Sequence, residues 1–421
     1  MRTMYSEDEW IRHGDELRRP FSVPDGFSSS EHVVIVGGGL SGLTIAYRLA
    51  SKRPDLQVTV VESKSTFGGV IDTWKEGEWV CDVAVNATRS HPSVWRLIED
   101  LDLGKEFSQS NPLARKRWIY IDGKQHQLSW KTAFKIGLIR LRRSMLDARK
   151  GSRSVAEVLP NEQIADAMTL GIVNDVAANV DADFLFPSLT KFGGNPPIKW
   201  SKLKKKIRKT YPLFTPKKGS VASLSGGMKT LIDKLVSILE AMSNVSLKND
   251  FHASSPEDVA SQYNVSQSSV IWTVPSGPED AFTSLSVYAI GYRNEDVSHI
   301  PTGYGTLIPD SNIPISGILH ESDVHSSQRA PEGNRMFRLM IPASRWNGDS
   351  MEILDSARNL ISPHEPVMFQ HIGDRNIPSY SPGYMASLSK EKYAYVRAGW
   401  GFSGVSITHV ISEAERLADL I

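Results

Sequence analysis

The chain has 421 residues, of which 40% are hydrophobic and 23% charged, and its formal net charge is +1. These totals are typical of a globular protein with about two domains, and they exclude a global charge that would attract nucleic acid or a membrane. The single cysteine, Cys81, excludes an intramolecular disulfide and is expected in the core. No apolar run reaches the roughly 18 residues of a membrane-spanning helix.

A strand, a glycine-rich turn and a helix follow a polar N-terminal extension of residues 1–31. Residues 33–49 read VVIVGGGLSGLTIAYRL, and the β-branched run at their start predicts a buried parallel strand. Glycines in G-x-G-x-x-G spacing permit a tight turn, close approach of a pyrophosphate and close packing of the helix on the strand. The residues that we expect at the phosphates are Gly37, Gly38, Gly39, Leu40, Ser41 and Gly42.

A second predicted strand ends in an acidic residue at the spacing that dinucleotide-binding proteins use. The segment QVTVVE covers residues 57–62, and Glu62 lies twenty residues beyond Gly42. A carboxylate at that place accepts hydrogen bonds from ribose hydroxyls. The strand, turn, helix and second strand together favour a bound dinucleotide over a glycine-rich turn without a ligand.

The glycine pair that follows favours FAD over NAD as the dinucleotide. Residues 63–74 read SKSTFGGVIDTW, and they resemble the E-x(5)-G-G-x stretch of flavoproteins in the amine oxidase and protoporphyrinogen oxidase superfamily. In that superfamily the paired glycines, here Gly68–Gly69, let the backbone run along the flavin side of the cofactor. The resemblance therefore implies FAD, bound without a covalent link.

The next segments combine predicted regular structure with two basic stretches. Helical spacing predicts a helix over residues 93–103, and Asp122–Gly123 predicts the turn of a hairpin over residues 115–128. Residues 130–150 have the pattern of a basic amphipathic helix, and residues 199–218 hold nine Lys or Arg and no acid. The second stretch fits a solvated loop or a contact with anionic lipid headgroups; nucleic acid is disfavoured because no nucleic-acid-binding signature accompanies it.

Four later segments predict that the chain returns to the dinucleotide-binding domain. Residues 223–239 read as a Gly-Gly turn followed by a helix, and residues 244–253 and 269–277 as strands. Residues 399–421 read as a glycine loop followed by a terminal helix. This order predicts an interrupted domain, with a second domain in the gaps.

Six segments, spread over residues 31–421, resemble the protoporphyrinogen oxidase family in the same order. They are RWIYIDGKQHQL, DADFLFPSLTKF, SGGMKTL, PTGYGTLIP, NIPSYSPGY and AGWGFSGVSI. The resemblance implies the family's reaction in haem synthesis, the stepwise six-electron oxidation of protoporphyrinogen IX to protoporphyrin IX. Dioxygen is the implied acceptor, reoxidising the flavin and giving hydrogen peroxide.

The resemblance also assigns cofactor positions beyond the glycine turn and Glu62. They are Val70 beside the flavin, Ala84, Val85, Asn86 and Ala87 in the flavin loop, Ala253 near the adenine, and Trp400, Val405, Ser406 and Ile407 closing over the flavin. No catalytic side chain and no metal are implied, because the flavin carries the hard step.

Three residues are implied at the substrate. Arg117 matches the family's active-site arginine, which pairs with a substrate propionate, and a bidentate arginine suits a planar carboxylate. Leu307 and Met340 match apolar positions that sandwich the tetrapyrrole. Two alternatives stay open: Arg117 as an exposed strand cation, and the other two as ordinary core residues.

The expected fold is α/β, with a discontinuous Rossmann-like FAD-binding domain, an α+β substrate domain and a helical, basic, membrane-associating insertion. The FAD-binding domain takes residues 32–92, 219–280 and 376–421, the helical and membrane-contact region takes 93–218, and the substrate domain takes 281–375. The resemblance implies a peripheral protein of the mitochondrial inner membrane in a eukaryote, or of the cytoplasmic membrane otherwise. A monomer and a homodimer both stay open.

Three departures from the family pattern keep rival functions open. DVAVNATRS replaces the family's Glu-x-Gly-Pro loop, Trp400 replaces a small residue, and the region 272–292 is short. The rivals are an FAD oxidase for an amine or another reduced ring system, and a non-catalytic paralogue that keeps the fold for binding.

One polar cluster raises the question of a metal site. It consists of His320, Glu321, Asp323 and His325, whose spacing fits no helical or zinc-finger ligand set. We interpret it as a solvated loop.

Overall fold

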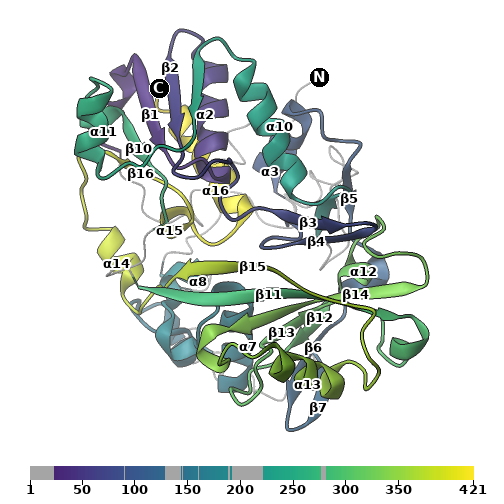
Figure 1. The fold of residues 1–421 in the computed structure, drawn as a ribbon. Helices are drawn as coiled ribbons and strands as arrows, with labels where there is room; N and C mark the ends of the chain where they lie inside the picture. The colour runs from purple at the N-terminus through teal and green to yellow at the C-terminus, as the bar shows by residue number, and fades with distance from the viewer. Residues whose placement is uncertain are drawn as a thin grey trace.

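The computed structural model describes residues 23–89, 91–128, 144, 146–159, 161–187, 190–191, 221–275 and 281–421. The described elements are arranged around two main sheets, one in each half of the molecule (Figure 1). The polar extension up to residue 22, residues 130–143 and 145 of the basic stretch 130–150, and the whole of 199–218 lie outside the described residues.

The first sheet is parallel and has five described strands in the order β16-β10-β1-β2-β9. They are β1 (His32–Val36), β2 (Gln57–Val61), β9 (Val245–Lys248), β10 (Val270–Trp272) and β16 (Val396–Arg397). The central strand β1 is apolar and fully buried over its last four residues because helices cover both faces of the sheet. These strands come from three distant parts of the sequence, so the predicted discontinuous Rossmann-like sheet is confirmed.

Helices on both sides of this sheet form its two cores. The larger core lies beneath α2 (Leu40–Lys52), α3 (Pro92–Asp100), α10 (Lys229–Glu240) and α16 (Ile407–Ala418). In α2 it takes Ile45 and Leu49, which recur at helical spacing. The opposite face is covered by α11 (Pro256–Gln262), through Val259 and Ala260.

The second sheet is mixed, with seven described strands in the order β15-β11-β14-β13-β12-β6-β7. They are β6 (Arg117–Ile121), β7 (Lys124–Gln127), β11 (Phe282–Arg293), β12 (Gly305–Leu307), β13 (Gly317–Leu319), β14 (Asn334–Pro342) and β15 (Met368–Pro378). One face packs on α13 (Ser350–Leu360). The other packs on four short or medium helices: α6 (Val155–Val158), α7 (Glu162–Val173), α8 (Ala182–Leu185) and α14 (Tyr384–Leu388).

Smaller elements connect the two halves. Figure 1 shows the hairpin of β3 (Thr73–Glu76) and β4 (Trp79–Asp82) between the two main sheets. The remaining elements are β5 (Phe107–Gln109), β8 (Ala222–Leu224), α12 (Glu321–Val324), α15 (Trp400–Ser403), and the 3-10 helices η1 (Phe27–Ser29), η2 (Pro112–Arg115), η3 (Ala177–Asn179), η6 (Gln267–Ser269), η8 (Glu295–Val297) and η9 (Ala343–Arg345).

Several local predictions are confirmed. The hairpin β6–β7 turns at Asp122 and Gly123, whose φ angles are 52° and 72°. The predicted helices near residues 93 and 229 are α3 and α10, and Cys81 is fully buried in the core. Among the described residues, no helix combines the length and the apolar character needed to cross a membrane.

Two of the expected domain limits differ from the structure. The limit between residues 375 and 376 falls inside β15, and Tyr380 and Tyr384 beyond it pack on the second sheet. Helix α3, assigned to the helical region, packs instead in the core of the parallel sheet. Both differences arise because a continuous strand and an amphipathic helix follow their packing partners, which sequence order does not reveal.

Candidate functional site

The turn between β1 and α2 has the shape that the glycine motif predicts. Gly37 has a φ of 108°, and a Cβ placed on it would lie 2.5 Å from Thr273 Oγ1. A Cβ on Gly42 would lie 1.9 Å from the carbonyl oxygen of Gly37. Side chains are therefore excluded at both positions, and the N-terminus of α2 presents backbone to a phosphate.

Glu62 is held just beyond the end of β2, with its buried carboxylate against this turn. Its Oε2 accepts a hydrogen bond from the amide of Gly38 at 2.7 Å, and its Oε1 accepts one from the amide of Lys64 at 2.9 Å. These bonds fix the carboxylate beside the turn, where a ribose-binding acid is expected.

The second glycine motif lies directly on the first. The amide of Gly68 donates to the carbonyl oxygen of Gly38 at 2.8 Å, and a Cβ on Gly69 would lie 3.1 Å from Gly39 Cα. Gly68 and Gly69 have φ angles of 132° and 63°, which side chains disfavour. The two motifs therefore form one continuous backbone surface.

The C-terminal glycine loop meets the same turn. A Cβ on Gly399 would lie 3.1 Å from the carbonyl oxygen of Thr273 and 3.5 Å from Ser41 Oγ. The amide of Gly399 donates to Glu413 Oε2 at 2.7 Å, which fixes the loop to α16. Segments about 360 residues apart are thus adjacent, as the predicted interrupted domain requires.

Ser41 tests whether this turn fits a dinucleotide. Its hydroxyl oxygen is buried and has no hydrogen-bond partner among the described residues. Ser41 stands in the first turn of α2, where the phosphates of a dinucleotide bind. A phosphate oxygen would supply the missing partner, so the residues of the turn fit the pyrophosphate of FAD.

The residues predicted at the flavin end lie where two cores meet. Val70, Val85 and Trp400 are half-buried and pack on the core beneath the parallel sheet. Trp400 also packs, with Val405 and Met340, on the core of the second sheet. The fold therefore brings predicted flavin positions next to a predicted substrate position.

The remaining predicted cofactor residues occupy the ends of nearby elements. Ser406 caps α16, where its Oγ accepts a hydrogen bond from the amide of His409 at 3.4 Å, and Ile407 is the buried first residue of that helix. Ala253 packs on the smaller core with Phe251. The predicted adenine position thus lies beside Glu62, whose carbonyl oxygen accepts from the amide of Phe251 at 2.9 Å.

The predicted flavin loop rests on two arginines of the second sheet. The carbonyl oxygen of Ala84 lies 3.3 Å from Arg338 Nη1 and 3.5 Å from Arg375 Nη1, and both guanidinium groups donate to it. Asn86 donates through Nδ2 to Glu321 Oε1 at 3.5 Å. A loop without the expected Gly and Pro is therefore supported by the buried Arg338 and Glu321 and by the half-buried Arg375.

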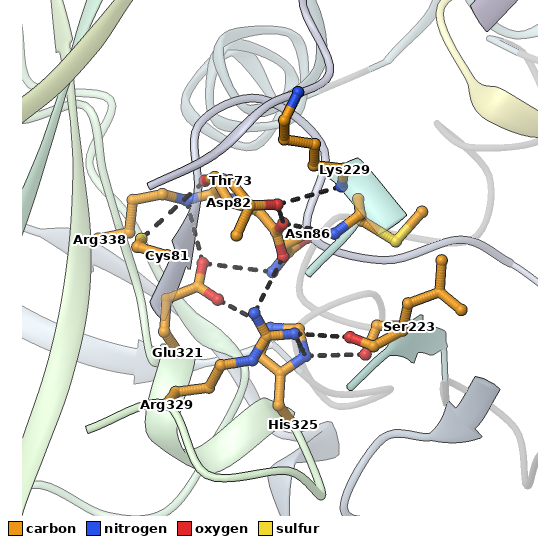
Figure 2. Close-up of polar contacts among 12 residues, drawn as sticks. Thr73, Cys81, Asp82, Asn86, Ser223, Lys229, Glu321, His325, Arg329 and Arg338 are labelled. Atoms are coloured by element: carbon orange, nitrogen blue, oxygen red, sulfur yellow. Dashed lines mark hydrogen bonds and ion pairs between the residues drawn. The ribbon is translucent and has the colours of Figure 1, made fainter. Parts of the chain in front are cut away.

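These charged groups form a network beneath the loop. Figure 2 shows the carboxylate of Glu321 in contact with Asn86, Arg338 and His325. Glu321 Oε1 lies 3.0 Å from Arg338 Nε, and Oε2 lies 2.8 Å from His325 Nε2. Arg329 joins the network through Asp82, with 3.3 Å between Nη1 and Oδ2.

Burial and pairing set the pKa values in this network. Burial raises the pKa of Glu321, but Arg338, the hydrogen bond from His325 and Arg329 outweigh burial and lower it to about 2. Burial raises the pKa of Asp82 despite Arg329. Burial also raises the pKa of the Cys81 thiol, so Cys81 is a protonated core residue rather than a nucleophile.

The solvated loop predicted for residues 320–325 is therefore wrong. The side chains of Glu321 and His325 are 0% exposed, and His320 is paired with Asp323 at 3.2 Å. Burial lowers the pKa of His320. Within the described residues no group of three or more side chains could hold a metal ion. The cluster is held by the ion pairs of Asp323 with Arg335 and of Glu321 with Arg338, and by contacts of the two histidines with the same carboxylates.

Arg117 is connected to the predicted flavin loop by one aromatic residue, Tyr304. Its guanidinium stacks over the ring of Tyr304, 4.3 Å from the centroid. Tyr304 packs with Ala87 on one small apolar cluster. Arg117 is half-buried rather than an exposed strand cation, although it stands near the edge of the sheet in β6.

Leu307 and Met340 meet on the same face of the second sheet. A Cβ on Gly317 would lie 2.3 Å from Met340 Cε and 3.9 Å from Leu307 Cδ2. Arg117 is paired with Gly305, two residues before Leu307, so its side chain leaves the sheet on this face too. The fold therefore gathers the three predicted substrate residues on one surface.

Arg338 and Arg375 are site residues that the sequence patterns did not reveal. Arg338 interrupts the apolar strand MFRLMIP, and a charge within a buried strand is a signal that could have marked it. Arg375 stands in a polar stretch of β15, where no pattern distinguishes it.

Comparisons with known proteins place this geometry among flavin-type oxidases. Residues 35–101 match the NAD(P)-binding Rossmann-like domain. The chain is 25% identical to protoporphyrinogen oxidase 2, chloroplastic/mitochondrial, of Arabidopsis thaliana, over 93% of this chain and 94% of the relative. It is 23% identical to coproporphyrinogen III oxidase of Propionibacterium freudenreichii, over 92% and 90%.

Solved structures show the same fold. A candidate protoporphyrinogen oxidase from Exiguobacterium aligns with a TM-score of 0.63 at 14% identity, over 93% of this chain and 98% of that one. A reduced UDP-galactopyranose mutase aligns with a TM-score of 0.61 at 14% identity, over 93% and 95%. The predicted kinship with the porphyrinogen oxidases is confirmed as a distant relationship over the full length, and with it the expectation of FAD.

Proposed function

We propose that this chain, a divergent member of the amine oxidase superfamily with FAD as its cofactor, oxidises a porphyrinogen to the porphyrin with dioxygen as acceptor. The proposal rests on one observation above the rest: three positions assigned to a tetrapyrrole lie on one sheet face, and one of them, Met340, packs on the same core as Trp400 and Val405, which are assigned to the flavin. The full-length similarity to two porphyrinogen oxidases supports the same substrate class.

Each part of the chain has a definite task in this function. Ser41 and the backbone around it would bind the pyrophosphate, and Glu62 the ribose. Trp400, at the meeting of the two cores, would exclude water from the flavin. When bound, FAD supplies the acceptor of hydride equivalents.

The second sheet would orient the substrate. Leu307 and Met340 offer an apolar surface to a flat ring, and Arg117 offers a bidentate cation to a carboxylate. Tyr304 holds the guanidinium by stacking, so less conformational freedom is lost when the carboxylate binds.

Peripheral membrane contact is part of the proposal. The nine basic residues of 199–218 would bind anionic headgroups, and Trp200 and Phe214 in the same stretch would contact the membrane interface. The compartment would be the mitochondrial inner membrane surface in a eukaryote. Binding to vesicles containing anionic lipid should weaken as salt is added, because the attraction is electrostatic.

A flavin spectrum followed by a porphyrinogen assay tests the function. Purified protein should carry or take up FAD, and it should then convert protoporphyrinogen or coproporphyrinogen to a fluorescent porphyrin with consumption of dioxygen. A flavin-containing protein that oxidises neither porphyrinogen would instead be an oxidase of another substrate. A protein unable to take up FAD would be the non-catalytic paralogue.

A further inference from the structure

Arg375 is a cation in apolar surroundings at the edge of the second sheet. It lies in β15 directly opposite Leu285, and the residues two positions before and after it on the same face are Gly373 and Ile377. Leu285 and Ile377 are buried members of the core on that face. The neighbours of Arg375 on its own strand and on β11 are thus apolar, and the charged group near it is another cation, Arg338, which donates to the same carbonyl oxygen of Ala84.

β15 also touches the segment that we assign to the flavin loop. A Cβ on Gly373 would lie 2.8 Å from Val83 Cγ1, and Arg375 Nη1 donates to the carbonyl oxygen of Ala84 at 3.5 Å. Arg375 therefore stands where the sheet face meets the loop, on the substrate side of the proposed cofactor site.

No carboxylate among the described residues neutralises Arg375. In the network beneath the loop, Glu321 pairs with Arg338 and Asp82 pairs with Arg329. Arg375 has only the long bond to Ala84, and its Nε has no described partner. The adjacent Asp374 leaves the strand on the opposite face, where it accepts from Ser286 at 2.7 Å.

The electrostatic surroundings make an anion favourable at this point. Burial, and then the charge of Arg338, lower the pKa of Arg375 to about 10, so the group is still a cation at neutral pH. A buried charge that lacks a partner is destabilising, and a bound anion removes that penalty. An arginine can bind a planar carboxylate through two parallel hydrogen bonds.

We propose that Arg375 binds a carboxylate of an otherwise apolar ligand, as a second anchor on the sheet face that also carries Arg117. The assignment of this ligand to the substrate rests on the proposed function. β6 and β15 are separated by five strand spacings, about 24 Å between backbones. A ligand that engages both arginines therefore carries carboxylates on opposite edges; coproporphyrinogen, with a propionate on each ring, does so, whereas the two propionates of protoporphyrinogen IX share one edge.

Benzoate, a flat apolar ring with one carboxylate, is the probe for this site. Isothermal calorimetry should show benzoate binding to the purified protein with or without FAD. Arg375→Gln should weaken it at least tenfold, and Arg375→Lys, which keeps the charge but loses the bidentate geometry, should weaken it less. Lys116→Gln, which removes an exposed cation outside the proposed site, is the control and should leave the benzoate affinity unchanged.

A stability measurement separates this role from a structural one. Because Arg375→Gln removes a half-buried charge that has no described counter-ion, the ligand-free variant should unfold at a higher temperature than the parent protein. Unchanged benzoate affinity in this variant, or no benzoate binding by the parent protein, would overturn the proposal. A third result would also overturn it: Arg375→Gln adds sulfite to its bound FAD more weakly than the parent protein but binds benzoate equally well. The charge of Arg375 would then act on the flavin and not on a carboxylate ligand.

The two proposals fail in different experiments. If the protein binds benzoate through Arg375 but takes up no FAD, the carboxylate site stands and the oxidase function falls. If the protein oxidises a porphyrinogen while Arg375→Gln leaves its KM and the benzoate affinity unchanged, the oxidase function stands and the second anchor falls.

Discussion

Glu321 and Arg338 form a buried ion pair beneath the loop assigned to the flavin, with 3.0 Å between Oε1 and Nε and side chains 0% and 4% exposed. Each charge depends on the other, because neither can be hydrated where it lies. The pair also connects α12 to β14, and through Arg338 to the carbonyl oxygen of Ala84. Its integrity should therefore decide both the stability of the fold and the shape of the loop.

Removing one charge of this pair should destabilise the protein strongly. Glu321→Gln leaves Arg338 buried without its counter-ion, which typically costs about 3–5 kcal/mol in the free energy of unfolding. Urea denaturation near neutral pH measures the change. The matched control is Glu365→Gln, which breaks an exposed pair with Arg358 at 2.7 Å and should leave the midpoint nearly unchanged.

The same network should make stability fall in acid. The pKa of Glu321 is about 2 in the folded protein against an ordinary value of 4.5, so the stabilisation that it provides is complete above pH 4.5 and is lost as the pH falls towards 2. Burial lowers the pKa of His320 from 6.5, so the unfolded chain gains a proton first and stability begins to fall below pH 6.5.

Denaturation curves over this pH range separate the two contributions. The difference in stability between the parent protein and Glu321→Gln should be constant above pH 4.5 and should shrink as the pH falls below it. The pKa of Asp82 is raised in the folded protein, so protonation of Asp82 favours the folded state and partly offsets the loss of overall stability in acid. A difference that stays constant down to pH 3 would contradict the role given to Glu321.

The sequence revealed the dinucleotide site because its information is local. Gly37, Gly42 and Glu62 stand within thirty residues, and the strand, turn and helix that carry them follow from hydrophobic pattern and glycine geometry alone. The contact of Gly399 with Ser41 was predictable only through the family resemblance, since nothing local joins segments so far apart.

The buried network was misjudged because burial is a non-local property. HESDVH is a polar segment by composition, and its burial depends on Arg335, which pairs with Asp323, and on Arg338, which pairs with Glu321. The order of strands in the second sheet is equally non-local. It places β15 at one edge, where Arg375 meets Ala84, although about 290 residues separate the two.

A side chain at Gly42 should abolish cofactor uptake. Gly42→Ala places a Cβ 1.9 Å from the carbonyl oxygen of Gly37, so the turn has to open and the phosphate position changes. FAD content after purification and reconstitution measures the loss. Gly104→Ala is the control, because nothing lies within 4 Å of the added Cβ, and it should retain FAD as the parent protein does.

The hydroxyl of Ser41 should contribute to FAD affinity without contributing to the stability of the ligand-free protein. Its oxygen is buried and has no described partner, so Ser41→Ala should leave the unfolding temperature of the apoprotein unchanged or raise it slightly. Loss of a hydrogen bond to a charged phosphate should make the free energy of FAD binding less favourable by about 1.5–3 kcal/mol. Flavin fluorescence titration and thermal unfolding of the apoprotein, made on the same samples, test the two halves.

Arg117 should affect substrate but not cofactor. Its guanidinium is stacked at 4.3 Å on Tyr304 and its strand belongs to the second sheet, not to the sheet that carries the glycine turn, so Arg117→Ala should raise the KM for a porphyrinogen while FAD content stays unchanged. Arg117→Lys should recover part of the loss, because the charge remains while the bidentate geometry does not. Lys116→Ala, at the exposed neighbouring position, should behave as the parent protein. Loss of FAD from Arg117→Ala would mean that this arginine supports the flavin loop through Tyr304 and Ala87 rather than the substrate.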